Sequence, residues 1–219
     1  TFPMERIISE IRYIAKRSSS HLWIFADANF GMLNRDIDIA KEVRSVADEY
    51  GVLNRVELWW AKNSSKRTTE ITKVLDKLTD PLAAVQSLDP KVLKIIDRDN
   101  ISITTMTDLL EQWKKQKLKS TTDVLVGLPG DSLSSHLETL RKTFEMGFNN
   151  INVGNVRMLP GSDMETDMSR NTFKLKTKYR LISGSYGKYD GLPIFEYEES
   201  VRSSKDITED EMRYLRIIH

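Results

Sequence analysis

The chain of 219 residues contains no cysteine. It therefore forms no disulfide, offers no thiolate nucleophile and supplies no thiolate to a metal cluster. Basic and acidic residues nearly balance, 33 against 32, so bulk charge favours neither nucleic acid nor an anionic membrane as a partner. No apolar run approaches the roughly 18 residues of a membrane span, and no signal peptide is recognisable. These absences predict a cytoplasmic protein with no membrane or nucleic-acid partner.

Histidine is also scarce, with three residues in the whole chain. His21 precedes an apolar run, His136 falls in a polar helical segment, and His219 is the last residue, so their spacing is not that of a metal site. We expect all three to be surface histidines. Glycine-rich phosphate loops of Walker or Rossmann spacing are likewise absent from the sequence.

What the chain does have is a repeated cycle of an apolar run, a polar loop and a segment of helical periodicity. The runs span residues 22–27, 55–60, 82–87, 122–127 and 151–156. Such a cycle is typical of an α/β fold with parallel strands and right-handed crossovers. We therefore predict a parallel barrel, whose working face is built from the loops that follow the strands.

Helical segments fill the spaces between these runs. We expect helices over residues 3–17, 37–50, 68–78, 90–97, 107–118 and 133–146. Gly51 and Gly147 provide C-caps, and Asp89 followed by Pro90 is a strong helix start. Because a helix comes first, the strand that normally precedes it in a βα repeat is missing, and the chain resembles a barrel without its opening unit.

The regular alternation stops after Gly161. We predict a barrel core over residues 1–161 and a C-terminal α/β extension over 162–219 that packs on the open side of the barrel. In the extension we expect a turn at 184–187, a strand at 192–198, and a final helix that begins at Thr208. Thr208 and Glu211 match a capping box.

Polar residues end the first and third runs. Asp27 and Asn29 can exchange hydrogen bonds with the amino group of a ligand, although Asp27 could equally fix the turn that follows. Gln86 and Ser87 end a strongly apolar run, where a ligand carboxylate or ribose hydroxyl could pair with them. A helix-capping role for Ser87 competes with this interpretation.

The last two runs lead into glycine-proline turns. Gly127, Pro129 and Gly130 join a strand to a helix N-terminus, where free amides and a close backbone could face a flat ligand. Such turns are common connectors. A second one, residues 159–162 beginning at Leu159, favours a shared pocket.

Four of these motifs occur in the order and register of the radical S-adenosylmethionine (SAM) enzymes. They are Asp27–Gly31, Val85–Leu93 with Arg98 beyond it, Val126–Asp131 and Leu159–Ser162. The chain most resembles the cobalamin-binding branch of that superfamily, and residues 179–216 resemble the end of the branch's catalytic domain. One departure is Asp131, where the family often has glutamate.

The resemblance implies a partial TIM-type (β/α)6 barrel. In the family the first strand is followed by a CxxxCxxC loop that holds a 4Fe–4S cluster, which chelates SAM and cleaves it reductively to a 5′-deoxyadenosyl radical. That unit is absent here. The resemblance therefore implies a catalytic-core fragment, inactive alone, of a longer polypeptide that carries the cysteines and a cobalamin-binding domain upstream. The substrate is not identified.

Roles can be carried over position by position from the resemblance. Asp27 and Asn29 match the contact to the methionyl amino group. Gln86 and Ser87 match the contact to ribose or carboxylate, and Arg98 matches a basic residue that helps to hold the carboxylate. The turn and last-strand contacts to adenine fall on Gly127, Pro129, Gly130 and Leu159.

Two other functions compete with this one. The chain could be a degenerate barrel that binds a nucleotide-like ligand or a protein partner without catalysis. It could also be a barrel hydrolase or lyase with Asp27 and Asp123 as acid and base, although no histidine or metal pattern supports those carboxylates.

Overall fold

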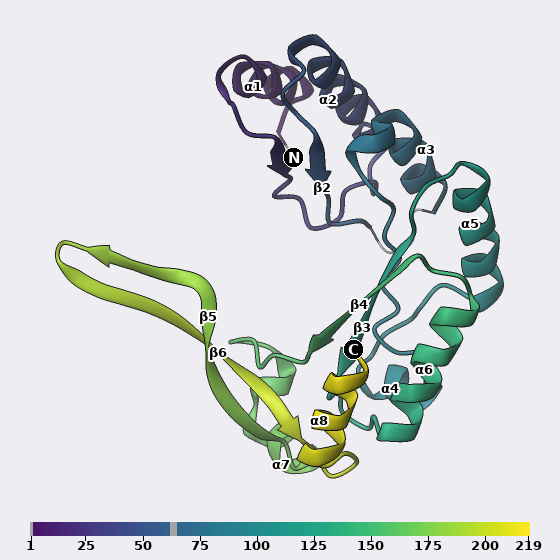
Figure 1. Ribbon diagram of the computed structural model, residues 1–219, viewed down its shortest axis with the longest axis vertical. Coiled ribbons are helices and arrows are strands. Elements are labelled where there is room, and N and C mark those ends of the chain that lie inside the picture. Colours follow the sequence, from purple (N-terminus) through teal and green to yellow (C-terminus); the bar gives the residue numbers. More distant parts are fainter. Residues whose placement is uncertain (1, 62–64) are drawn as a thin grey trace. The chain divides into compact units, whose positions relative to one another are not determined.

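The computed structural model describes residues 2–61 and 65–219 as alternating helices and short strands followed by a long hairpin and a final helix (Figure 1). The chain divides into two compact units. The first comprises residues 1–84, 101–122 and 146–150, and the second comprises 85–100, 123–145 and 151–219. In the described part of the chain, no helix combines the length and apolarity required to cross a membrane. The cytoplasmic location stays a prediction.

The first unit packs helices against two short parallel strands. Its elements are α1 (Met4–Arg17), β1 (Leu22–Ile24), α2 (Asp36–Tyr50), β2 (Arg55–Glu57), α3 (Ser65–Leu75), the 3-10 turn η1 (Asp76–Leu78) and α5 (Ile103–Lys115). β1 pairs with β2 in parallel, and a further parallel bridge joins Phe30 to Trp60. Val43, Val56 and Ile71 lie at the centre of the apolar core between the helices and strands.

Both strands are shorter than predicted. The side chains of Leu22 and Ile24 are exposed, so one face of β1 contributes no buried apolar surface. Only the opposite face of the β1–β2 pair is stabilised by burial. Ladder pairing then stops at Ile24 instead of running to residue 27. The parallel strands that the structure describes form only short two-stranded sheets, and they do not confirm the predicted partial barrel.

The second unit contains the other parallel strands. Its elements are α4 (Pro90–Ile95), most of β3 (Thr121–Val126), α6 (Leu133–Glu145), most of β4 (Asn150–Asn155), the 3-10 turn η2 (Asp163–Glu165), α7 (Asp167–Phe173), β5 (Lys176–Tyr189), β6 (Leu192–Ser203) and α8 (Glu209–Ile218). β3 and β4 are neighbours. The N–H of Asn150 donates to the carbonyl of Ser120, and the N–H of Val156 donates to the carbonyl of Val126. The residue numbers of both partners rise together, as they do in a parallel pair.

The predicted strand at 82–87 is present only as two parallel bridges to β3, Leu82 to Thr121 and Gln86 to Val124. Regular pairing breaks because Gln86 adopts a left-handed backbone conformation with φ of 57°. The helices fit better. Gly51 caps α2 as predicted, with φ of 68°, and α8 begins with the predicted capping box of Thr208 and Glu211.

The hairpin of β5 and β6 differs from the prediction. The turn lies at Asp190–Gly191, with φ of 49° and 83°, and not at residues 184–187. A two-residue hairpin loop of the favoured type needs a positive φ at both positions, and the pair Asp-Gly adopts these values readily. Gly184 instead lies where the register shifts, between the pairs at Leu181 and Tyr186. β5 was not predicted because both of its faces are largely exposed, which removes the apolar alternation that marks a strand.

The tail also pairs with the segment that follows β4. The N–H of Val201 donates to the carbonyl of Val156, and the N–H of Met158 donates to the carbonyl of Glu199. β6 therefore runs antiparallel beside residues 156–158. The domain boundary after residue 161 stays a prediction.

An ion pair fixes α7 to this hairpin and gives the fold an acid-sensitive contact. Both Arg170 nitrogens Nη1 and Nη2 donate to the Glu199 carboxylate at 2.7 Å, and Thr177 donates to it as well. The hydrogen bonds from Arg170 hold the pKa of Glu199 at about 2, below its ordinary 4.5.

We expect this pair to stabilise the fold fully above pH 4.5 and to lose that contribution as the pH falls toward 2. The lowered pKa corresponds to about 2 kcal/mol at neutral pH, allowing for partial solvent screening. Urea titrations from pH 2 to 7 should show Glu199→Gln less stable than wild type at neutral pH and equal to it at the acid end. Glu111→Gln, an exposed change on α5, should follow wild type throughout. A constant gap between Glu199→Gln and wild type would contradict this assignment.

Candidate functional site

The loop after β1 carries the first two predicted site residues. The Asp27 Oδ1 accepts the N–H of Asn29 at 2.9 Å, which is the turn-fixing role considered from the sequence. Both side chains are exposed to solvent. Asp27 thus organises its own loop, and it also remains accessible to a ligand.

Two further residues hold this loop in place, and no pattern in the sequence singles them out. The buried Asp36, at the start of α2, accepts the N–H groups of Gly31 and Leu33 through Oδ2, both at 2.9 Å. Arg67 of α3 donates from Nε to the carbonyl of Gly31 at 2.7 Å. The loop is therefore fixed to two helices and positions Asp27 on a defined backbone.

Gln86 and Ser87 lie beside β3. The Gln86 backbone donates to the carbonyl of Asp123 at 2.7 Å and accepts from Leu125 at 2.9 Å. Ser87 is 2% exposed, and its Oγ accepts the N–H of Asp89 at 3.2 Å. Asp89, not Ser87, caps α4. The alternative of a helix-capping Ser87 is therefore wrong.

Arg98 is linked to the same strand end through Asn100. Its Nε donates to Asn100 Oδ1 at 3.0 Å, and the Asn100 Nδ2 donates to the carbonyls of Val85 and Ser87 at 3.0 and 2.9 Å. Burial lowers the pKa of the Arg98 guanidinium. The structure thus brings Ser87 and Arg98 into one hydrogen-bonded group, with Asn100 as a connecting residue that the sequence did not reveal.

The turn after β3 is buried. Gly127 and Gly130 have φ of 90° and 79°, a region that favours glycine. A Cβ on Gly130 would lie 2.4 Å from Cδ1 of Ile95. Pro129 is buried in the same turn. By contrast, Leu159, the fourth predicted adenine contact, is 60% exposed.

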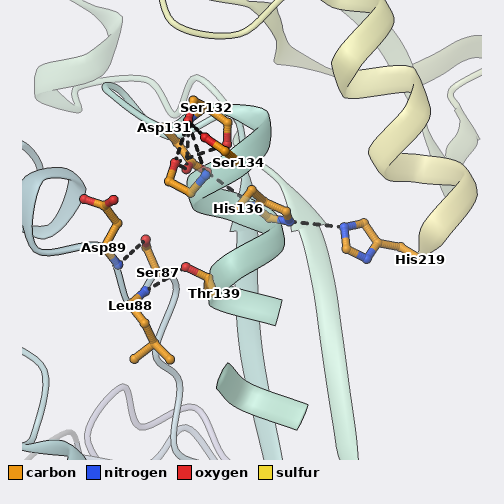
Figure 2. A network of polar contacts seen from close by, with 10 residues as sticks. Ser87, Leu88, Asp89, Asp131, Ser132, Ser134, His136, Thr139 and His219 are labelled. Carbon is orange, nitrogen blue, oxygen red and sulfur yellow. Dashed lines mark hydrogen bonds and ion pairs between the residues drawn. The ribbon is translucent and has the colours of Figure 1, made fainter. Parts of the chain in front are cut away.

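A buried polar network follows this turn (Figure 2). Asp131 and His136 are each 1% exposed, so the expectation that His136 is a surface residue is wrong. Asp131 Oδ1 accepts from the N–H of Ser132 at 3.0 Å and from the hydroxyl of Ser135, and Oδ2 lies 3.2 Å from His136 Nδ1.

The network continues from His136 to the end of the chain. His136 Nε2 lies 3.2 Å from Nε2 of His219, and burial followed by the proximity of His136 lowers the pKa of His219. On the other side of α6, Thr139 accepts the N–H of Leu88, next to Ser87 (Figure 2). The helix that follows the glycine turn is therefore connected to the Ser87 strand end as well as to α8.

The predicted site residues fall in both units. Asp27 and Asn29 belong to the first, and Gln86, Ser87, Arg98, Gly127, Pro129, Gly130 and Leu159 belong to the second. Their convergence on one ligand stays a prediction. Over residues 2–61 and 65–219, no group of three or more histidine, cysteine, aspartate or glutamate side chains could hold a metal ion.

No protein-family model matches the chain. A search of curated proteins finds the cobalamin-dependent radical SAM methyltransferase TokK of Streptomyces tokunonensis, 29% identical over 180 residues. It also finds the 2-(S-pantetheinyl)-carbapenam-3-carboxylate methyltransferase of Streptantibioticus cattleyicolor, 29% identical over 216 residues. The matches cover 80% and 96% of this chain but 26% and 31% of the relatives, so the chain spans less than a third of their length.

Solved structures show the same likeness of fold. The radical SAM coproporphyrinogen III oxidase HemN of Escherichia coli aligns with 70% of this chain and 37% of its own, at a TM-score of 0.53 and 13% identity. The radical SAM methyltransferase TsrM of Kitasatospora setae aligns with 84% of this chain and 36% of its own, at 0.57 and 9% identity.

The predicted resemblance to the cobalamin-dependent radical SAM enzymes is confirmed by the match to TokK, and the solved structures add a likeness of fold.

Proposed function

We propose that these 219 residues form the SAM-binding part of the catalytic core of a cobalamin-dependent radical SAM methyltransferase. The observation that carries the proposal is the order of polar and glycine motifs after successive apolar runs. One relative of the chain is a cobalamin-dependent radical SAM methyltransferase, and the other is a methyltransferase. In barrels of this family the residues that follow the parallel strands build the working face.

The loop after β1 would bind the methionyl amino group of SAM. Asp27 and Asn29 are exposed, and their loop is fixed by Asp36 and Arg67. A carboxylate and an amide oxygen on a rigid backbone are good acceptors for an ammonium group. Little conformational entropy would then be lost when the ligand binds.

The Ser87 strand end would bind the polar half of the ligand. Arg98 carries a charge that suits the methionyl carboxylate, and Asn100 holds it against the carbonyl of Ser87. Gln86 and Ser87 would contact ribose or carboxylate oxygens. The turn at Gly127, Pro129 and Gly130, together with Leu159, would contact adenine, for which an exposed apolar side chain such as Leu159 is suited.

The residues of this chain do not fit a 4Fe–4S cluster, because the chain has no cysteine. In the proposed function the cluster that cleaves SAM reductively, and the cobalamin named for TokK, are held by residues outside these 219. The identity of the methyl acceptor is not part of the proposal.

Binding of SAM to this chain tests the assignment of the residues. We expect weak binding by isothermal titration, because the iron contacts to the methionyl end are absent. Replacing an ionic partner typically costs 1.5–3 kcal/mol, so Asp27→Ala and Arg98→Gln should each weaken binding about tenfold or more. Asp108→Ala, an exposed aspartate on α5, is the matched control and should bind as wild type does. Equal affinity of all four proteins would contradict the assignment.

A degenerate barrel that binds a nucleotide-like ligand without catalysis is the second candidate. The lack of cysteine favours it. This second candidate also predicts that the 219 residues bind SAM. The two candidates differ in activity, because in the second one the complete polypeptide has no cysteine motif with which to cleave SAM.

A further inference from the structure

Basic side chains from β5, β6 and α8 surround a small cavity in the second unit. Figure 1 shows the base of the hairpin beside α8. The cavity has a volume of about 240 Å³. It is lined by Lys178, Arg202, Glu209, Met212, Arg213 and Arg216. None of these residues belongs to the proposed SAM site.

The charges around the cavity are not balanced. Four cationic side chains face one carboxylate, Glu209, whose Oε1 lies 2.7 Å from Lys178 Nζ and 3.4 Å from an Arg213 nitrogen. Glu209 is therefore shared by two of the cations. Arg213 also pairs with Asp210, whose Oδ1 lies 3.1 Å from its Nη1. With these two carboxylates counted against Lys178 and Arg213, Arg202 and Arg216 remain as an excess of positive charge at the cavity.

Those two arginines show the signs of an incomplete site. The Nε of Arg202 is buried and has no hydrogen-bond partner, although buried donors normally have one. Arg216 is an exposed residue, but partial burial of its guanidinium, and then the nearby positive charges of Arg202 and Arg180, lower its pKa. Guanidinium groups held close together repel one another unless an anion lies between them.

We propose that this cavity binds a dianionic oxyanion, the phosphate group of a small molecule. Arginine forks match phosphate oxygens with paired hydrogen bonds, and the excess of positive charge favours a dianion over a single carboxylate. The cavity is smaller than the roughly 300–1,000 Å³ of whole-ligand pockets. It therefore fits one charged group at the end of a longer molecule. The proposal does not rest on SAM binding.

Inorganic phosphate is the probe that tests the site. Calorimetric titration of the 219-residue chain at constant ionic strength should show phosphate binding, with acetate and chloride much weaker. Arg202→Gln and Arg216→Gln should each weaken phosphate binding about tenfold, since a hydrogen bond to a charged group typically contributes 1.5–3 kcal/mol. Lys188→Gln removes the same charge near the tip of β5, away from the cavity, and should bind phosphate as wild type does.

Circular dichroism should show that the variants fold, and removing one of two repelling charges should leave their melting temperatures unchanged or higher. Arg216 is exposed, so Arg216→Gln keeps the test valid even if Arg202→Gln fails to fold. Acetate binding as tightly as phosphate would overturn the proposal. So would equal phosphate affinity of Arg216→Gln, Lys188→Gln and wild type.

Discussion

Incubated anaerobically with iron, sulfide and dithionite, the 219-residue chain should acquire no stoichiometric cluster and release no 5′-deoxyadenosine from SAM. Cluster iron needs thiolate ligands, and the chain has none. The expected effect is complete loss of the reaction rather than a reduced rate, because no other group in the described residues forms a metal site. Iron analysis, the visible spectrum and chromatography of the nucleoside products measure the outcome.

A cysteine-containing radical SAM enzyme treated in the same way is the positive control for the reconstitution. Release of 5′-deoxyadenosine by the 219-residue chain in amounts above that of a heat-denatured sample would contradict the prediction. It would mean that non-cysteine side chains of this chain can support the reaction.

Replacing Asp131 by alanine should cause the largest loss of stability among the polar changes considered. The carboxylate accepts from the backbone of Ser132, the hydroxyl of Ser135 and Nδ1 of His136, and the residue is 1% exposed. Leaving buried donors without an acceptor costs about 1–3 kcal/mol each, so we expect a loss of about 3 kcal/mol after local rearrangement. Urea denaturation followed by circular dichroism measures it.

Two variants control for the loss of the side chain. Asp108→Ala removes an exposed aspartate from α5 and should change stability by less than about 0.5 kcal/mol. Asp131→Asn keeps an acceptor oxygen and should be intermediate. A stability of Asp131→Ala within error of Asp108→Ala would show that the network contributes little to folding.

Local signals in the sequence account for the helices. Gly51 ends α2 because glycine, which has no Cβ, adopts the left-handed C-cap conformation without a steric clash. Asp89 begins α4 because its carboxylate accepts two free backbone N–H groups of the first turn. These determinants lie within a few residues of the element that they set. The strands depend on partners far along the chain. The strand predicted at 22–27 is therefore present only over Leu22–Ile24, and residues 82–87 pair through two isolated bridges instead of a strand.

The site shows the same division between local and tertiary determinants. Asp27 and Ser87 are candidates from the sequence because polar residues that end apolar runs stand out, and their role in a site stays a prediction. Asn100, Asp36 and Arg67 could not, since their roles come from hydrogen bonds made across the fold. His136 looked like a surface residue because its partner His219 is 83 positions away.

Cleavage of SAM by the complete polypeptide that contains these 219 residues tests the central claim most directly. Expressed from its whole reading frame, reconstituted with iron and sulfide and supplied with cobalamin, dithionite and SAM, it should form 5′-deoxyadenosine, and Asp27→Ala in that polypeptide should form much less. A fully reconstituted polypeptide that forms none would contradict the enzymatic function and leave the non-catalytic binding module.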